Sequence, residues 1–230
     1  MEKIVLQLYD ATFWLFLRLH YKEYSSHKFI TYGEKKGIIK FSRDDRIWFT
    51  ADSHIGHRNI IKYCKRPFSD VEEMNKTLFS NWNKVVGKDD FVFHLGDFSV
   101  GGAAEWTSLL DSLNGRIFLV LGNHDMNNVD QGFMRRFEDV SMQMLISISK
   151  QRVYLNHYPF LCYGGAYRGT WQLFGHLHTS SCMSGLDSPR AQMLFPGQYD
   201  VGVDNNNYTP ISLAEVEVKI QEQIAKSTML

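Results

Sequence analysis

The chain has 230 residues, of which 44% are hydrophobic and 22% are charged. This profile is typical of one large folded domain and excludes a fibrous or low-complexity protein. Lysine and arginine number 25, as do aspartate and glutamate, so the formal net charge is zero. This balance argues against a general polyanion binder, which usually carries a basic excess, but it is compatible with a local basic groove.

Residues 1–45 differ in pattern from the rest, and we interpret them as an amino-terminal extension. The apolar run ATFWLFLRLH (11–20) is too short to span a bilayer, and it favours a buried or docking helix over a signal or anchor. KFITYGEKKGIIKF (28–41) is typical of a hairpin. Because the run at 11–20 is too short for a span, we expect no membrane contact. The three cysteines form no C-x-x-C motif and cannot all pair, so we expect a reducing, cytoplasmic location.

Residues 46–230 form the predicted main domain, in which short apolar runs alternate with segments of helical spacing. The predicted strands cover residues 46–50, 90–96, 116–122, 142–149, 151–157, 171–176 and 198–204. The strands at 142–149 and 151–157 suggest an antiparallel pair because a tight connection joins them. Residues 180–198 are the most loop-like stretch, and we expect a mobile insertion beside any site.

Four helices are predicted in the same region. The first begins near His57 and ends near Pro67. The second covers residues 70–86, the third 103–113 and the fourth 213–226. Asp70 with Glu73, and Ser212 with Glu215, have the spacing of a capping box. Helices and strands alternate early and strands then follow one another, which predicts an α/β protein with mixed sheets.

Polar clusters follow five of the predicted strands. They are ADSHIGH (51–57), LGDFS (95–99), LGNHDM (121–126), LNHYP (155–159) and FGHLHT (174–179). Singly, each Asp is explained by a turn or helix cap, each His by packing, and His94 is interpreted in this ordinary way. Active sites in open α/β sheets gather at the carboxyl ends of strands, so five such sets together predict one shared crevice.

The residue types in these clusters suit a centre with two metal ions. Imidazole, carboxylate and amide ligands without a cysteine favour divalent Mn, Fe, Zn or Mg over thiolate-bound metals. Two cations about 3.5–4 Å apart can share one carboxylate and one hydroxide, and that hydroxide is a nucleophile at neutral pH. In an extended segment, residues i and i+2 point the same way, so Asp52 with His54, and His176 with His178, would face one cavity. If the second segment curves instead, His176 and His178 could serve adjacent ions.

The ordered set of D-x-H, G-D, G-N-H-D, a lone His and G-H-x-H resembles the calcineurin-like metallophosphoesterase superfamily. These elements occur here as DSH, GD, GNHD, NHY and GHLH, between residue 46 and about residue 215. The stretches DSHIGHRNIIKYCKRPF and DVGVDNNNYTPIS further resemble small bacterial and phage members. The resemblance implies a four-layer α/β/β/α sandwich of two facing mixed sheets, with the site at one edge.

The resemblance also implies a role for each residue of the motifs. It implies that the first metal is bound by Asp52, His54 and His178, that the second is bound by Asn123, His157 and His176, and that Asp97 bridges them. His124 would donate a proton to the leaving oxygen, with Asp125 orienting its ring or favouring its charged form. His57, Arg58 and Arg168 are weaker candidates for phosphate contacts. The run after GD is FSVGG, so the Arg or Asp that the family often carries there is missing.

The resulting hypothesis is a metal-dependent phosphoesterase that attacks phosphate mono- or diesters with a metal-bridging hydroxide. Two divalent ions are expected, Mn first, with Fe, Zn, Ni or Mg as alternatives. Small phosphodiesters or nucleotides are favoured over nucleic acid because the charge is balanced and no clamp domain is evident. The alternative is a catalytically silent metal-binding scaffold or interaction module, against which the presence of His124 argues. The sequence does not indicate the oligomeric state.

Overall fold

The computed structural model describes residues 38–128, 135–180, 183 and 187–227. The expected helix at 11–20 and the first strand of the expected hairpin lie outside these residues. The second part of that hairpin is described: β1 (Ile39–Phe41) pairs in parallel with a later strand, Ile39 opposite Ile146. The division of the chain at residue 45 stays a prediction.

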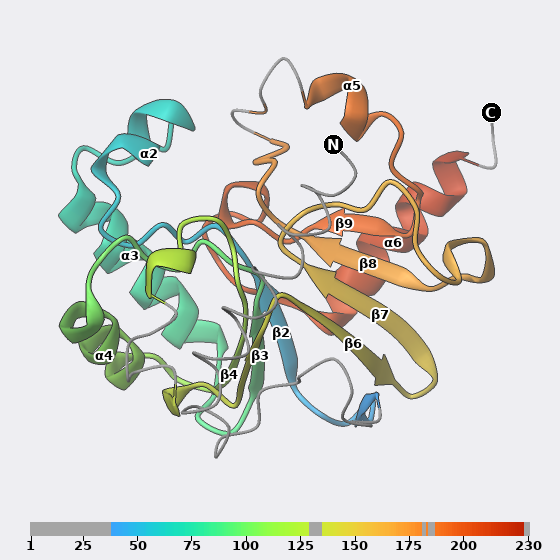
Figure 1. Cartoon of the computed structure of the whole chain (residues 1–230), viewed down its shortest axis with the longest axis horizontal. Helices are drawn as coiled ribbons and strands as arrows, with labels where there is room; N and C mark the ends of the chain where they lie inside the picture. The colour runs from blue at the N-terminus through green and yellow to red at the C-terminus, as the bar shows by residue number, and fades with distance from the viewer. Residues whose placement is uncertain (1–37, 129–134, 181–182, 184–186, 228–230) are drawn as a thin grey trace, which may run out of the picture. The chain divides into compact units, whose positions relative to one another are not determined.

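Two five-stranded mixed sheets form the centre of the described domain (Figure 1). One has the order β1, β6 (Gln143–Ile148), β7 (Gln151–Asn156), β8 (Trp171–Phe174), β9 (Gln198–Asp200). The other has the order β10 (Ile211–Ser212), β2 (Ile47–Thr50), β3 (Phe91–His94), β4 (Arg116–Val120), β5 (Asp139–Ser141). The pairs β6–β7 and β10–β2 are antiparallel and the other pairs are parallel. These sheets confirm the expected α/β sandwich.

The main core lies between the two sheets. Alternate residues of β2 and β3, such as Phe49 and Phe93, point into it and stack with ring centroids 5.7 Å apart. Ile146, Leu155 and Leu173 supply the facing side chains from the second sheet. Because side chains alternate along a strand, the intervening residues of β2 and β3 point to the opposite face, where helices cover them.

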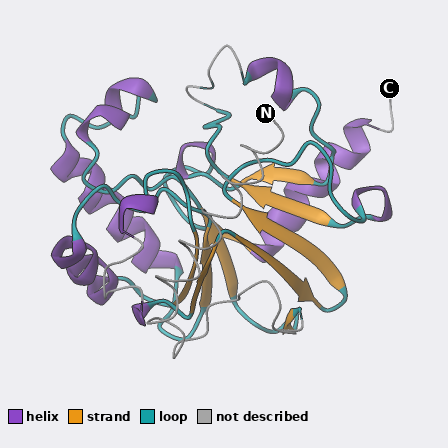
Figure 2. Ribbon diagram, viewed as in Figure 1, coloured by secondary structure: helices purple, strands orange, loops and turns teal. Residues whose placement is uncertain are grey.

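Helices flank the sheets (Figure 2). They are α2 (Arg58–Tyr63), α3 (Val71–Val85), α4 (Ala103–Ser112), α5 (Ser188–Ala191) and α6 (Leu213–Ser227), with short 3-10 turns η1 (Met126–Asn128), η3 (Ala166–Arg168) and η4 (Val203–Asn205). In α3, Trp82 stacks on His94 of β3, with ring centroids 6.3 Å apart. Helix α6 contacts β2, β9 and β10.

The predicted helix caps are confirmed by hydrogen bonds. Asp70 accepts the Glu73 backbone N–H at 2.8 Å, and the hydroxyl of Ser212 accepts the backbone N–H of Glu215. Two short strands, β5 and β10, were not predicted. The strand predicted at 198–204 ends earlier, because the chain enters η4 at residue 203. The loop-like stretch at 180–198 contains the one-turn helix α5.

Candidate metal centre

The polar clusters meet at one edge of the two sheets. The parallel strands β2, β3 and β4 are followed by Asp52, Asp97 and Asn123. Backbone hydrogen bonds tie the first two of these loops together, since the N–H of His54 donates to the carbonyl of Asp97 at 2.9 Å. From the other sheet, Gly175 N–H donates to the His157 carbonyl at 3.0 Å. Strand ends distant in sequence therefore build one site, as the sequence predicted.

The first cluster consists of Asp52, His54 and His178. One potential ligand atom from each lies within 4.8 Å of the others. The rings of His54 and His178 stack, with centroids 5.5 Å apart. The backbone N–H of His176 donates to both Asp52 oxygens, at 3.0 and 2.9 Å, which fixes this carboxylate in place. The three residues expected to bind one metal thus lie close together.

The second cluster consists of Asn123, His157 and His176. One potential ligand atom from each of His157, His176 and Asp97 lies within 4.8 Å of the other two. The Asn123 side-chain oxygen lies 3.2 Å from His157 Nε2. The rings of His157 and His176 meet edge-on, with centroids 5.0 Å apart. This cluster contains the residues that the family resemblance gives to the second metal.

Asp97 lies between the two clusters. Its Oδ2 is 3.5 Å from His54 Nε2, and its Oδ1 is 3.6 Å from His157 Nε2. Each carboxylate oxygen therefore faces a histidine of a different cluster. This is the arrangement that a carboxylate shared by two cations requires.

The hydrogen bonds of the histidines fit a metal centre. His54 Nε2 is buried and has no hydrogen-bond partner among the described residues. His157 Nδ1 donates to the Leu95 carbonyl at 2.8 Å, and His178 Nδ1 to Asp204 at 2.7 Å. Metal-binding histidines commonly donate their second ring N–H to such acceptors, which leaves Nε2 free for a cation. The donor set therefore fits divalent ions with nitrogen and oxygen ligands.

Cysteine does not join this ligand set in the described structure. Cys64 lies near His178 and Asp204 but is disulfide-bonded, and Cys162 is an exposed free thiol. The bonded state of Cys64 differs from the expectation that all cysteines are reduced. The location of the protein stays a prediction.

The backbone conformation of the ligand residues was not anticipated. Five of them have positive φ: Asp52 (57°), His54 (49°), Asp97 (56°), His176 (70°) and His178 (47°). The expectation that D-x-H is an extended segment is therefore wrong, whereas the positive φ values of His176 and His178 agree with the alternative of a curved H-x-H segment. Left-handed conformations are uncommon outside glycine and cost free energy, so their concentration here indicates that the surrounding structure enforces the site.

Two glycines of the motifs are required by close packing. A Cβ at Gly122 would lie 2.3 Å from Asp97 Oδ1, and a Cβ at Gly96, where φ is +94°, would lie 2.6 Å from the Gly122 nitrogen. The G-D and G-N-H-D loops therefore touch backbone to backbone. This contact brings Asp97 and Asn123 together.

Burial controls the charge of the metal-free site. It raises the pKa of the Asp52 and Asp97 carboxyls and lowers the pKa of His54 well below its usual value. The pKa of His157 falls to about 4, mainly because the ring is buried. Neutral imidazoles have a free lone pair, and a bound cation would favour the ionised carboxylates, so both effects suit metal binding.

His124 lies over the first cluster with its side chain 39% exposed. Its ring centroid is 4.9 Å from that of His54 and 5.4 Å from that of His57. Its backbone N–H donates to Asp97 Oδ1 at 2.9 Å, while its Nε2 is 3.9 Å from Asp97 Oδ2. The ring is thus fixed beside the cluster but open to solvent, as a group that meets substrate must be.

Asp125 does not act on His124 in the expected way. Its buried carboxylate accepts backbone N–H groups of Asp97 at 2.8 Å, Phe98 at 2.9 Å and Gly122 at 2.8 Å. These bonds occupy both oxygens and join the two motif loops. None of these bonds goes to the His124 ring, so they do not support the expected orienting role, and the alternative, that Asp125 favours the charged form of His124, stays a prediction.

The three weaker candidates divide. His57 joins the site, because its Nδ1 is 3.4 Å from His54 Nδ1. Arg58 begins α2 and Arg168 ends η3, and both are exposed. No side-chain hydrogen bond or ion pair joins either arginine to the clusters within the described ranges.

Three residues near the clusters were missed from sequence. Asp204 and Arg66 form a buried ion pair behind the first cluster, and the hydroxyl of Tyr158 lies 3.4 Å from the Asn123 side-chain oxygen. Asp204 follows β9 within DVGVDNNN, a stretch whose family resemblance was noted, so its position after a strand was an available signal. Arg66 lies in the other stretch with that resemblance, DSHIGHRNIIKYCKRPF, but it follows a helix and not a strand.

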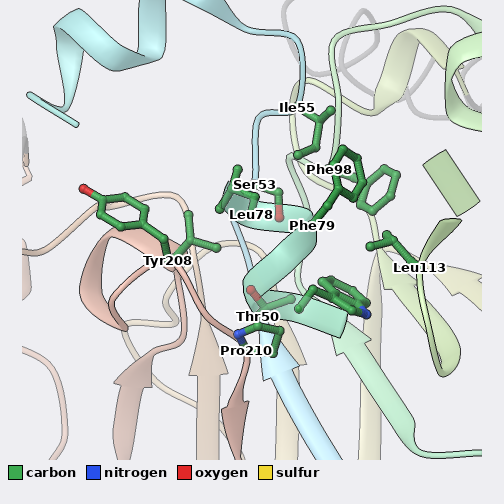
Figure 3. A pocket seen from close by; sticks show the side chains of 11 residues that line it. Thr50, Ser53, Ile55, Leu78, Phe79, Phe98, Leu113, Tyr208 and Pro210 are labelled. Atoms are coloured by element: carbon green, nitrogen blue, oxygen red, sulfur yellow. The ribbon is translucent and has the colours of Figure 1, made fainter. Parts of the chain in front are cut away.

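An apolar pocket lies on the other side of the DSH segment (Figure 3). Its empty space is about 310 Å³ when the part open to solvent is included, and Ser53, Ile55, Leu78, Phe98 and Tyr208 are among its lining residues. None of the cluster residues lines it. It therefore belongs to the packing of α3 rather than to the metal centre.

The chain belongs to the calcineurin-like phosphoesterase family, whose sequence model matches residues 45–211. An uncharacterized protein of Methanocaldococcus jannaschii, MJ1445, is 37% identical over 185 residues, which cover 77% of this chain and 92% of that protein. The gene 66 protein of Mycobacterium phage L5 is 36% identical over 132 residues, covering 50% of this chain and 63% of the phage protein.

A solved structure is similar in fold. The protein of unknown function AQ665 from Aquifex aeolicus superposes with a TM-score of 0.57 at 25% identity, covering 76% of this chain and 98% of AQ665.

Among the described residues, no helix is long and apolar enough to cross a membrane.

Proposed function

We propose that this protein is a phosphoesterase that uses two divalent metal ions. The observation that carries the proposal is the position of Asp97, whose two oxygens face His54 of one cluster and His157 of the other at 3.5 and 3.6 Å. A pair of cations, when bound, lowers the pKa of an attacking water and offsets the charge of the phosphoryl oxygens. Manganese is the metal we expect first, with Fe, Zn, Ni or Mg as alternatives, since ligands that combine imidazoles with oxygen donors can bind several divalent ions.

In this proposal His124 protonates the leaving oxygen. The ring is exposed enough to meet a substrate, and the backbone bond from His124 to Asp97 holds it beside the clusters. Loss of an alkoxide from phosphorus is slow without a proton, and a positioned general acid contributes about 10²–10⁴-fold in rate. His57 lies on the same side of the first cluster and is the candidate for a phosphate contact.

The proposed substrates are small phosphodiesters or nucleotides, with nucleic acid as a less favoured possibility. Two exposed tyrosines flank the clusters: the Tyr158 ring is 4.6 Å from that of His176, and the Tyr63 ring is 6.4 Å from that of His57. Aromatic side chains at such positions stack on nucleobases. The balanced charge of the chain gives no support to a long polyanionic substrate.

The test is an assay of the full chain, first stripped of metal with a chelator. We expect it to hydrolyse bis-p-nitrophenyl phosphate or p-nitrophenyl phosphate after Mn²⁺ is added, and not before. The alternative function is a silent metal-binding scaffold of the same fold. Absence of turnover by metal-replete protein, on both esters and on a panel of nucleotides, would favour that alternative.

A further inference from the structure

A buried ion pair lies behind the first cluster. Arg66 donates through Nε to Asp204 Oδ1 at 2.8 Å and through a terminal nitrogen to Oδ2 at 2.7 Å. Both side chains are fully buried. A bidentate pair of this kind fixes both groups in one geometry. Removing two charges from water costs free energy that offsets their attraction, so the pair need not stabilise the fold. Its contacts with the first cluster indicate another role.

The arginine also holds the backbone of the DSH segment. Its terminal nitrogens donate to the carbonyl of Asp52 at 2.7 Å and to the carbonyl of Ser53 at 3.1 Å. Asp52 and His54 have positive φ, a conformation that the segment must be held in by its surroundings. Arg66 is therefore placed to maintain the turn that presents Asp52.

The aspartate holds the third residue of the same cluster. His178 Nδ1 donates to Asp204 Oδ2 at 2.7 Å. This bond fixes the tautomer that leaves His178 Nε2 unprotonated, and it fixes the orientation of the ring. The corresponding nitrogen of His157, in the second cluster, donates to a backbone carbonyl. Within the described residues, the hydrogen bonds of Arg66 and Asp204 thus reach residues of the first cluster and none of the second.

We propose that Arg66 and Asp204 are positioning residues that assemble the first cluster, joining Asp52 and His178 from distant parts of the chain. This inference rests on the proposed function, since it assumes that both clusters bind metal. It predicts that loss of the ion pair weakens the binding of the metal ion at the first cluster. The second cluster, with its separate supports, keeps its ion.

The test is metal titration of the full-length apo protein with Co²⁺, followed by elemental analysis and by the visible absorption of the bound ions. In Asp204→Asn, the one amide oxygen can replace either Oδ2, which accepts from Arg66 and His178, or Oδ1, which accepts from Arg66 Nε, and the amide nitrogen opposes the donors on the other side. We expect one Co²⁺ dissociation constant to rise by about 10–100-fold, the other to stay unchanged, and the absorption of the weakened ion to change. Glu138→Gln is the matched control, because Glu138 pairs bidentately with Arg116 on the surface.

Several outcomes would contradict the inference. Two ions bound by Asp204→Asn with wild-type affinity and spectrum would overturn the positioning role alone. Equal weakening of both ions in a folded variant would overturn its selectivity. A wild-type chain that binds fewer than two ions would instead overturn the dinuclear site of the proposed function, and this inference with it.

A second variant covers the case in which Asp204→Asn does not fold. The double change Arg66→Met and Asp204→Leu removes both charges and leaves no unpaired ion in the interior, which proteins often tolerate. We expect the same selective loss of one Co²⁺ ion. Retention of both ions at wild-type affinity in the folded double variant would overturn the role of the pair.

Discussion

The two metal clusters have similar ligands but different surroundings. Behind the first, Asp204 and Arg66 place a charged pair against His178 and the backbone of Asp52. Behind the second, His157 donates to the neutral carbonyl of Leu95. The family motifs are spread evenly over both clusters, whereas the supporting bonds are not. Two sites with one kind of ligand can therefore depend on different parts of the chain.

The change that breaks both clusters together is Asp97→Asn. It removes a carboxylate whose two oxygens face His54 and His157. We expect both ions to bind more weakly and turnover to fall below detection, because an amide cannot offer two anionic oxygens to two cations. Elemental analysis and the phosphodiester assay measure this. A variant that keeps two ions and wild-type turnover would refute a shared role for Asp97.

The next largest effect is expected from His124→Ala, which leaves both clusters intact. Turnover of an ester with a poor leaving group should fall by about 10²–10⁴-fold, while both ions stay bound. A p-nitrophenyl ester serves as the control, since its leaving group needs little protonation and its loss should be smaller. Full turnover of the poor leaving group would show that His124 is not the general acid.

Asp125→Asn tests the hydrogen bonds that connect the G-D loop to the G-N-H-D loop. Asp125 accepts three backbone N–H groups, from Asp97, Phe98 and Gly122, and an amide nitrogen would oppose at least one of them. We expect the free energy of unfolding to fall by about 1–3 kcal/mol in urea titrations. If Asp125 instead acted on the His124 ring, stability would be unchanged and the pH profile of turnover would move.

The smallest effect concerns His94, beneath the first cluster. Its Nε2 lies 2.8 Å from the Ser53 hydroxyl, and burial lowers its pKa to about 3. In the unfolded chain His94 binds a proton near pH 6.5, whereas in the folded chain it stays neutral until about pH 3. The free energy of unfolding therefore falls as the pH drops from about 6.5 to 3.

His94→Phe should reduce this acid dependence in the metal-free protein, by up to about 1.4 kcal/mol per pH unit across that window. The phenyl ring retains the stacking on Trp82. Urea titrations at several pH values measure the slope. An unchanged slope between pH 6.5 and pH 3 would mean that His94 is protonated in the folded state.

The sequence predicted that the polar residues of the clusters come together at one edge, because each carries a local signal. Asp52, Asp97 and Asn123 follow apolar runs that read as strands, and the parallel order of those strands brings them to one edge. The capping boxes at Asp70 and Ser212 were predicted for the same reason, since the bonds join residues three apart. The roles of the ligand residues stay predictions.

The supports of the ligands were not predictable in this way. Arg66 and Asp204 are 138 residues apart, and a charged residue in a loop looks the same in sequence whether it is buried or solvated. The positive φ of His54 arises from tertiary contacts, which residue spacing does not report. Strands as short as β5 and β10 have too few residues to show a period of two.

The most direct test of a shared two-metal site is anomalous diffraction from crystals grown with Mn²⁺. We expect two peaks about 3.5–4 Å apart, one beside Asp52, His54 and His178, the other beside Asn123, His157 and His176, with Asp97 between them. A single peak, or peaks away from Asp97, would contradict the shared two-metal site.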